Sequence, residues 1–298
     1  MAPKLDPSHA IPSEIWFEEI APDYPVIRIR NQHATATIAL HGAHVIDYTP
    51  SDQQAIIFTS RDAIYQEGKA IRGGVPVCWP WFNAHPTDPS MPSHGFARNR
   101  FWQLTASQSI EQGTQIILEL DTNAIELWSH STKLTLTITV GKSLSIKLTT
   151  TNLSEAPLTI GGALHSYLTV GDIKKIQITG LEDTNFTDTI TGKQKKQQGA
   201  IEFSGETDNV YHNTDTATTI HDPLLKREVT VEKNGSQSTV IWNPWTEKSS
   251  TLPDLADDEF PQFVCIEAAN AHKDLYELNP GESHSLITII SSRPLSEC

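Results

Sequence analysis

The sequence predicts an all-β protein, a large antiparallel β-sandwich or barrel with few short helices. Apolar and polar residues alternate over many short segments, and glycine and asparagine turns separate these segments. Helical periodicity is hard to find anywhere along the chain. Strict alternation is typical of a strand with one buried face. Many such strands at short spacing are typical of an antiparallel sandwich or barrel.

The clearest strands form a hairpin. Over residues 132–140, leucine, isoleucine and valine alternate with threonine and lysine, so one face is apolar. Gly141 provides a turn, and the alternation resumes over residues 144–148. The two apolar faces therefore share one core.

Further strands are predicted in order along the chain. They cover residues 26–30, 35–40, 115–120, 158–162, 173–179, 228–233, 238–242, 263–268 and 285–290. The polar stretch 187–198 is expected to be an exposed hairpin or loop. Short helical turns are expected at 125–130 and 251–258. No linker or repeat divides the chain, so we predict one domain over residues 1–298.

Composition limits the function. The chain has 298 residues, with 22 Lys and Arg against 36 Asp and Glu, giving a net charge of −14. This acidic balance argues against nucleic acid and against an anionic membrane surface as partners. No apolar run approaches the roughly 18 residues that a membrane span needs. An anionic substrate would need a local basic site.

Three cysteines, Cys78, Cys265 and Cys298, lie far apart, and no CxxC motif occurs. Their odd number and spacing argue against a disulfide framework and against a zinc site, and favour a reducing compartment. The first ten residues have no basic start followed by an apolar segment, so no secretory signal is visible. We therefore expect a cytoplasmic protein, and a monomer, because no interface pattern stands out.

Two loop-like segments interrupt the strand pattern. Residues 71–82 contain Arg72, two adjacent glycines that indicate an unusual φ or a close backbone approach, and an aromatic cluster that suits core packing. Arg72 alone could form a surface salt bridge. Residues 93–98 carry His94 and Arg98. His94 could be a general acid, a hydroxyl donor or a loop-fixing residue. Two converging arginines would form a bidentate oxyanion clamp.

Chemistry-bearing residues also lie in three distant segments. His165 follows an apolar stretch, Asp208 lies among aromatic and β-branched residues, and Glu267 interrupts an otherwise apolar strand. A buried carboxylate is costly unless it is paired. Glu267 therefore either points to solvent or lies in a partly dry pocket, with a pKa suited to proton transfer.

Taken together, these segments resemble the hexose-6-phosphate mutarotases (glucose-6-phosphate 1-epimerases) of the galactose-mutarotase-like superfamily. The matching segments, in order, are IRGGVPVCWPWF (71–82), SHGFAR (93–98), ALHSYL (163–168), ETDNVY (206–211), VIWNPW (240–245) and VCIEAAN (264–270). The resemblance implies a supersandwich of two extensive sheets with a sugar site on a concave face. This agrees with the independent prediction of an all-β fold.

The resemblance also implies a reaction and a set of roles. The α and β anomers of an aldohexose 6-phosphate would interconvert by ring opening and closure, with no metal or other cofactor. The implied roles are general acid for His165, general base for Glu267, sugar-hydroxyl partners for His94 and Asp208, and a phosphate clamp for Arg72 and Arg98. The implied partner is thus a small sugar phosphate.

Three alternatives remain open at this point. A glycoside hydrolase would use Asp208 and Glu267 as its paired carboxylates. A non-catalytic sugar-phosphate-binding module would stack a sugar on tryptophans, for which Trp81, Trp242 and Trp245 are candidates. A metal site at His41 and His44 is the weakest alternative, because no third ligand lies nearby in the sequence.

Overall fold

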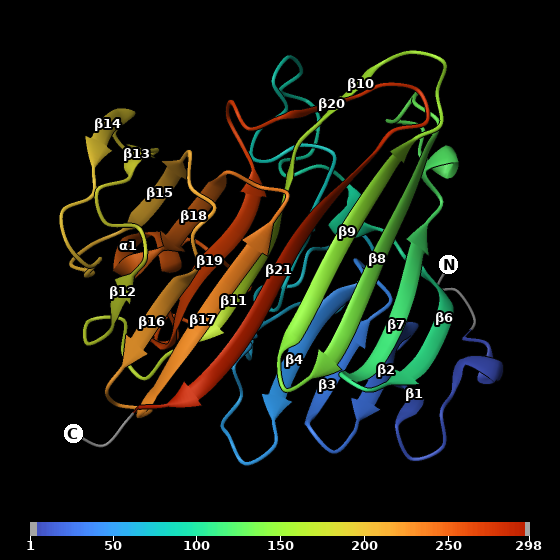
Figure 1. Ribbon diagram of the computed structural model, residues 1–298, viewed down its shortest axis with the longest axis horizontal. Coiled ribbons are helices and arrows are strands. Elements are labelled where there is room, and N and C mark those ends of the chain that lie inside the picture. The colour runs from blue at the N-terminus through green and yellow to red at the C-terminus, as the bar shows by residue number, and fades with distance from the viewer. Residues whose placement is uncertain (1–4, 296–298) are drawn as a thin grey trace.

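The computed structural model describes residues 5–295 and confirms the all-β antiparallel sandwich (Figure 1). Its largest sheet has eight strands in the order β12-β16-β17-β21-β9-β8-β7-β6, and every pair in it is antiparallel. The strands are β6 (Gln103–Ile110), β7 (Gly113–Leu120), β8 (Thr132–Gly141), β9 (Leu144–Asn152), β12 (Gln177–Thr179), β16 (Thr218–Asp222), β17 (Arg227–Asn234) and β21 (Ser283–Pro294). The predicted hairpin is β8–β9.

Two further sheets lie behind this one in Figure 1. A four-stranded sheet contains β1 (Ile15–Ala21), β2 (Tyr24–Arg30), β3 (Ala34–Ala39) and β4 (His44–Pro50). A seven-stranded sheet has the order β14-β13-β15-β18-β19-β11-β5. Its strands are β5 (Val77–Cys78), β11 (Gly162–Thr169), β13 (Asn185–Asp188), β14 (Lys193–Lys196), β15 (Thr207–His212), β18 (Ser238–Asn243) and β19 (Phe263–Asn270).

A short two-stranded ribbon completes the sheets. It pairs β10 (Leu158–Ile160) with β20 (Tyr276–Leu278). The stretch predicted as an exposed hairpin or loop is the β13–β14 hairpin, whose second strand is fully exposed.

The main core lies between the layers. Leu136 and Ile138 of β8 are completely buried in the same cluster as Ile27 of β2 and Ile38 of β3. Each buried aliphatic side chain of this size stabilises the fold by about 1.5–3 kcal/mol relative to exposure. The alternation seen in the sequence therefore points one face of β8 into the space between the sheets.

Helices are few and short. They are η1 (Pro7–His9), η2 (Ala97–Asn99), η3 (Thr122–Ala124), α1 (Trp245–Ser249) and η4 (Phe260–Gln262). None of the described helices has the length and apolarity needed to cross a membrane.

Both predicted helical turns were wrong in position. The α-helix precedes residues 251–258, because the Asn243 side chain accepts a hydrogen bond from the Trp245 amide and starts the helix earlier. Likewise, the 3₁₀ turn η3 precedes residues 125–130, because Asp121 caps it.

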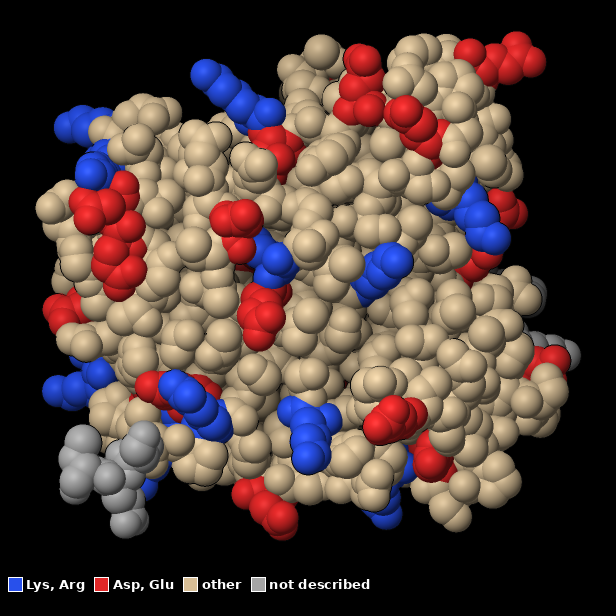
Figure 2. Space-filling view, in the orientation of Figure 1, with Lys and Arg blue, Asp and Glu red and all other residues tan. Residues whose placement is uncertain are grey.

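Charge on the face shown in Figure 2 is mixed. Blue and red side chains are interspersed over the eight-stranded sheet, with large uncharged areas between them. Any concentrated positive charge must therefore be sought elsewhere, and the seven-stranded sheet and its flanking loops contain the arginines singled out above.

Candidate active site

His165 and Glu267 form the centre of the site. They are direct cross-strand partners on β11 and β19, so their side chains lie on the same face of the sheet. The Nε2 atom of His165 is 3.3 Å from Oε1 of Glu267, and the two side chains are only 11% and 1% exposed. The solvent-facing alternative for Glu267 is therefore wrong.

Burial sets the protonation of this pair. It lowers the pKa of His165 well below the usual value, and His94 adds to the shift. It also raises the pKa of Glu267 well above the usual value, to which Asp208 contributes while Arg98 opposes. Because a dry environment disfavours both charges, burial favours the form with a neutral imidazole and a protonated carboxyl group.

One oxygen of the carboxyl group is not used by the protein. Oε2 of Glu267 is buried and makes no hydrogen bond to any residue in the described part of the chain. Buried polar atoms in native proteins are rarely left without a partner. Oε2 therefore has hydrogen-bonding capacity that a ligand could use.

His94 lies in a constrained loop next to the pair. Its backbone has φ 63°, and its Nδ1 accepts a hydrogen bond of 3.3 Å from the amide of Asn83. Its ring packs against Phe82 and lies 6.1 Å from the His165 ring, centroid to centroid. Burial, reinforced by Arg98, lowers the pKa of His94 to about 3. A neutral His94 therefore fixes its loop through Nδ1 and offers an Nε2–H donor.

Glycines of both loops have positive φ, as the sequence indicated for the adjacent pair Gly73 and Gly74. Gly73 follows Arg72 and has φ 105°, and a Cβ there would collide with the backbone of Thr59. Gly95 has φ 70°, and a Cβ there would collide with the carbonyl of Trp79. Only glycine meets both demands, so these positions let the loops approach the sheet.

Arg72 is held by two partners. Its Nε donates to Oδ1 of Asp254 over 3.1 Å, and its Nη1 donates to the Tyr167 hydroxyl over 3.1 Å. The Tyr167 ring stacks on His165 at 4.9 Å between centroids and 12° between planes. The salt bridge considered for Arg72 does exist, but it is largely buried and lies beside the acid–base pair.

Arg98 and Asp208 lie around the same pair. Arg98 in η2 donates from Nη2 to the carbonyl of Ser93 over 3.0 Å. Asp208 on β15 is the cross-strand partner of Trp242, and burial raises the pKa of its carboxyl group. Both residues act electrostatically on Glu267. All six residues expected from the sequence thus gather in one electrostatic neighbourhood.

The three candidate tryptophans have different environments. The ring centroid of Trp242 lies 6.0 Å from that of His165 and 5.9 Å from that of Tyr167. Trp245 packs against Phe260, and Trp81 lies in a separate pocket. Only Trp242 is placed to contact a ligand bound at the acid–base pair.

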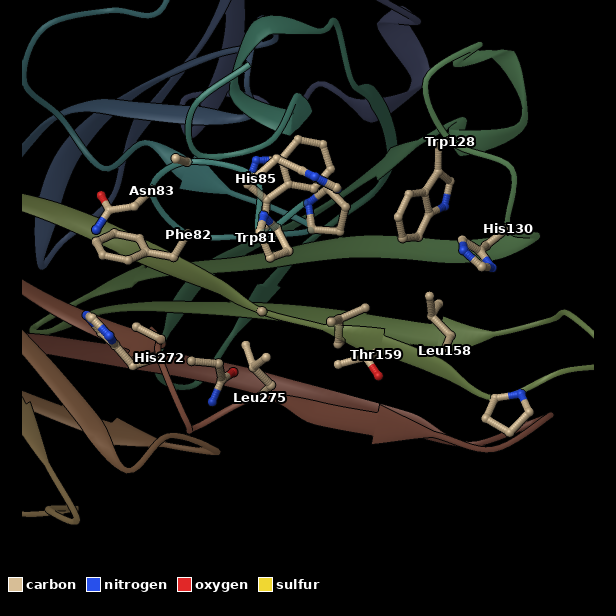
Figure 3. A pocket seen from close by; sticks show the side chains of 18 residues that line it. Trp81, Phe82, Asn83, His85, Trp128, His130, Leu158, Thr159, His272 and Leu275 are labelled. Carbon is tan, nitrogen blue, oxygen red and sulfur yellow. The ribbon is translucent and has the colours of Figure 1, made fainter. Parts of the chain in front are cut away.

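That separate pocket, of about 600 Å³, is shown in Figure 3. Phe82 in its lining also packs against the ring of His94. It is walled by aromatic and imidazole side chains, among them Trp81, Phe82, His85, Trp128, His130 and His272. Its lining includes neither His165 nor Glu267 and, among residues 5–295, no lysine, arginine or carboxylate. A pocket with no lysine or arginine in its lining has no guanidinium or ammonium group to clamp a phosphate. None of the six residues expected from the sequence lines it.

The other motif histidines and the cysteines make internal contacts. His41 bonds the Tyr24 hydroxyl and the Gly68 amide, and Nε2 of His44 bonds the carbonyl of Gly73. Within residues 5–295, no group of three or more His, Cys, Asp or Glu could hold a metal ion. Cys78 and Cys265 are buried free thiols, whereas Cys298 lies outside the described residues.

A buried His–Glu pair on one sheet of an antiparallel sandwich is an arrangement that can move protons. The family model described as aldose 1-epimerase matches residues 25–291. The chain therefore belongs to the aldose 1-epimerase family, whose members act on small sugars as epimerases or mutarotases.

Individual relatives and a solved structure are similar to this chain over most of its length. A "putative glucose-6-phosphate 1-epimerase" of Cenchrus ciliaris is 32% identical over 90% of this chain and 84% of its own length. One of Escherichia coli with the same name is 34% identical over 83% of each chain. The crystal structure of a "putative mutarotase" from Salmonella typhimurium has a TM-score of 0.88, 30% identity and 94% coverage of both chains.

Proposed function

We propose that this protein interconverts the α and β anomers of an aldohexose 6-phosphate, with glucose 6-phosphate as the first candidate. The observation that carries the proposal is the buried His165–Glu267 pair, with 3.3 Å between Nε2 and Oε1. Such a pair can reach two oxygens on one carbon. In a pyranose, the anomeric carbon carries these two oxygens, O1 and O5.

Ring opening moves one proton from O1 to O5. The Glu267 carboxylate takes the proton of the C1 hydroxyl, and the His165 imidazolium gives its proton to the ring oxygen as the C1–O5 bond breaks. The resulting aldehyde rotates about C1–C2 and presents its other face. The ring then closes with the two roles reversed, so protons and electrons balance over the cycle.

The pKa shifts of His165 and Glu267 bear on which of the two residues holds the proton before the sugar reacts. The reacting form has the proton on His165, whereas burial favours the proton on Glu267 in the free protein. The two forms contain the same number of protons and differ only by a transfer between neighbouring atoms. Sugar hydroxyls that donate to Glu267 would favour its ionised form, because hydrogen bonds to a carboxylate lower its pKa.

The phosphate would serve as an anchor. Arg72 and Arg98 both lower the pKa of His94 and of His165 through their charges, which indicates that they flank the two histidines. A chain of net charge −14 needs such a local concentration of positive charge to bind a phosphate dianion. Binding energy gathered at this non-reacting end can organise the reacting end.

His94 and Asp208 would orient the sugar. Nε2–H of neutral His94 can donate to a hydroxyl, and the part-buried Asp208 carboxyl can accept from one. Trp242, whose ring lies beside that of His165, would cover one side of the sugar ring. Orientation of this kind adds to the acid–base contribution.

The test is anomer exchange measured by NMR on glucose 6-phosphate and glucose in parallel. We expect exchange far above the uncatalysed rate, and faster for the phosphate ester. A folded protein that accelerates neither sugar would contradict the proposal and favour the binding module. Faster exchange on glucose would leave the epimerase chemistry intact and refute the phosphate preference.

A further inference from the structure

We propose that Tyr167 and Asp254 are positioning residues that aim Arg72 at the substrate phosphate, and that Tyr167 links this anchor to His165. The inference rests on the proposed function and adds residues that set the preference for a phosphorylated sugar. Its basis is one continuous array of contacts from Asp254 through Arg72 and Tyr167 to His165.

The array leaves a defined part of Arg72 available. A guanidinium group has five N–H donors in a fixed planar geometry. Nε is used by Asp254 and one Nη1 hydrogen by Tyr167, and the described residues contain no acceptor for Nη2. Both Nη2 hydrogens and one Nη1 hydrogen remain. These three hydrogens are available to donate to phosphate oxygens.

Burial gives these contacts their strength. The side chains of Arg72 and Asp254 are only 23% and 16% exposed. Burial disfavours the charge of Arg72, but Tyr167 and Asp254 outweigh it and raise the pKa of Arg72. Burial also raises the pKa of Tyr167, so this partner is a neutral phenol. Arg72 therefore stays charged, with its orientation fixed from two sides.

The two partners differ in their effect on a phosphate. Neutral Tyr167 accepts a hydrogen bond without reducing the positive charge of Arg72. Asp254 supplies a full countercharge, which fixes Nε but repels a dianion. Asp254→Asn separates these two effects of Asp254. It removes the negative charge, whereas the asparagine oxygen can still accept the hydrogen bond from Nε of Arg72.

Tyr167 also touches the general acid. It lies two residues after His165 on β11, so both side chains are on the same face of the strand. The two rings are stacked, and Trp242 contacts both of them edge-on. A shift of the Tyr167 ring must therefore be accompanied by a shift of the imidazole, which connects phosphate binding to the position of the acid.

The test compares two sugars in each variant. Tyr167→Phe keeps the stacked ring and removes the hydrogen-bond acceptor. We expect kcat/KM for glucose 6-phosphate to fall about tenfold, which is the loss expected for a hydrogen bond to a charged group. We expect kcat/KM for glucose to change by less than twofold. In an Arg72→Ala background, Tyr167→Phe should have no further effect on the phosphate ester.

Asp254 provides the second arm. Asp254→Ala should raise KM for glucose 6-phosphate about tenfold, whereas Asp254→Asn should leave KM unchanged or lower it. Tyr276→Phe is the matched control, because Tyr276 also stacks on a histidine, His284, but away from the site. Thermal melting checks that each variant folds.

The outcomes separate the two proposals. Equal losses on both sugars in Tyr167→Phe and Asp254→Ala would overturn the positioning role and leave the proposed function standing. Effects of Tyr167→Phe and Arg72→Ala that simply add would also overturn it. A wild-type protein that accelerates neither sugar would instead overturn the proposed function.

Discussion

His165 and Glu267 are joined by the backbone as well as by their side chains. They are register partners on β11 and β19, and each of these strands is hydrogen-bonded on its other side too, to β5 and β18 respectively. The 3.3 Å between their side chains is thus set by a sheet interior and not by a loop. Sites built on such elements hold their geometry better than sites on loops.

Glu267→Gln should abolish most of the activity without unfolding the protein. The amide has the same shape but cannot take the proton of the C1 hydroxyl, so we expect kcat to fall about 10²–10⁴-fold. The melting temperature should not fall, because a buried carboxyl group is costly to keep. NMR anomer exchange and thermal melting measure the two effects. A near wild-type rate would exclude Glu267 as the base.

The pH profile on glucose should be bell-shaped. Adding a proton to the pair charges His165, and removing one charges Glu267, and burial opposes both changes. The acid limb should therefore be set by His165 and lie below the ordinary pKa of histidine, and the alkaline limb should be set by Glu267 and lie above the ordinary pKa of glutamate. A rate that stays flat from about pH 4 to 9 would contradict the assignment.

The choice of sugar matters for this measurement. A sugar phosphate titrates near pH 6 itself, whereas glucose does not. Glu267→Gln provides the control, because its residual activity should lack the alkaline limb.

Arg98→Ala should impair the phosphorylated sugar selectively. Loss of a charge-assisted hydrogen bond to phosphate should lower kcat/KM for glucose 6-phosphate about tenfold or more. The fall in kcat/KM for glucose should be smaller. The matched control is Arg293→Ala, since Arg293 is 77% exposed and pairs with Glu228 across β21 and β17 of the eight-stranded sheet, whereas His165 and Glu267 lie in the seven-stranded sheet. Equal losses on both sugars would refute a phosphate contact.

Gly95→Ala should destabilise the His94 loop much more than Gly192→Ala destabilises its turn. The two glycines have φ 70° and 69°, so both substitutions incur the left-handed penalty of about 1–2 kcal/mol. Only at Gly95 would the new Cβ meet backbone atoms, since nothing lies within 4 Å at Gly192. Chemical denaturation compares the two. Similar losses in both variants would show that space at Gly95 is unimportant.

Much of the fold could be predicted because strands with one wet face have an obvious pattern. The alternation over 132–148 corresponds to β8 and β9. By contrast, the segments that carry His165 and Asp208 were noted for their chemistry and not predicted as strands, yet the two residues lie in β11 and β15. Their polar residues serve a site, so they interrupt the alternation without ending the strand. Residues 173–179 were overpredicted, because only 177–179 form a ladder.

Part of the site could be predicted because polar residues interrupt the apolar pattern of a strand. Glu267 stood out because a carboxyl group interrupts an apolar strand. Tyr167 did not, since a buried tyrosine looks like ordinary core. Asp254 could not be found at all, because its contact with Arg72 spans 182 residues of sequence and no local pattern reports it. Long-range side-chain pairing is the information that one sequence lacks.

The division of the site between strands and loops has an evolutionary consequence. The acid–base pair lies on two interior strands, whereas Arg72, His94 and Arg98 come from one contiguous stretch between β4 and β6. Under the proposed function, mutation, insertion or exchange within that stretch can change which sugar is held while the two proton-transfer residues are inherited intact. A lineage of this fold can therefore diversify its substrates without reinventing its chemistry.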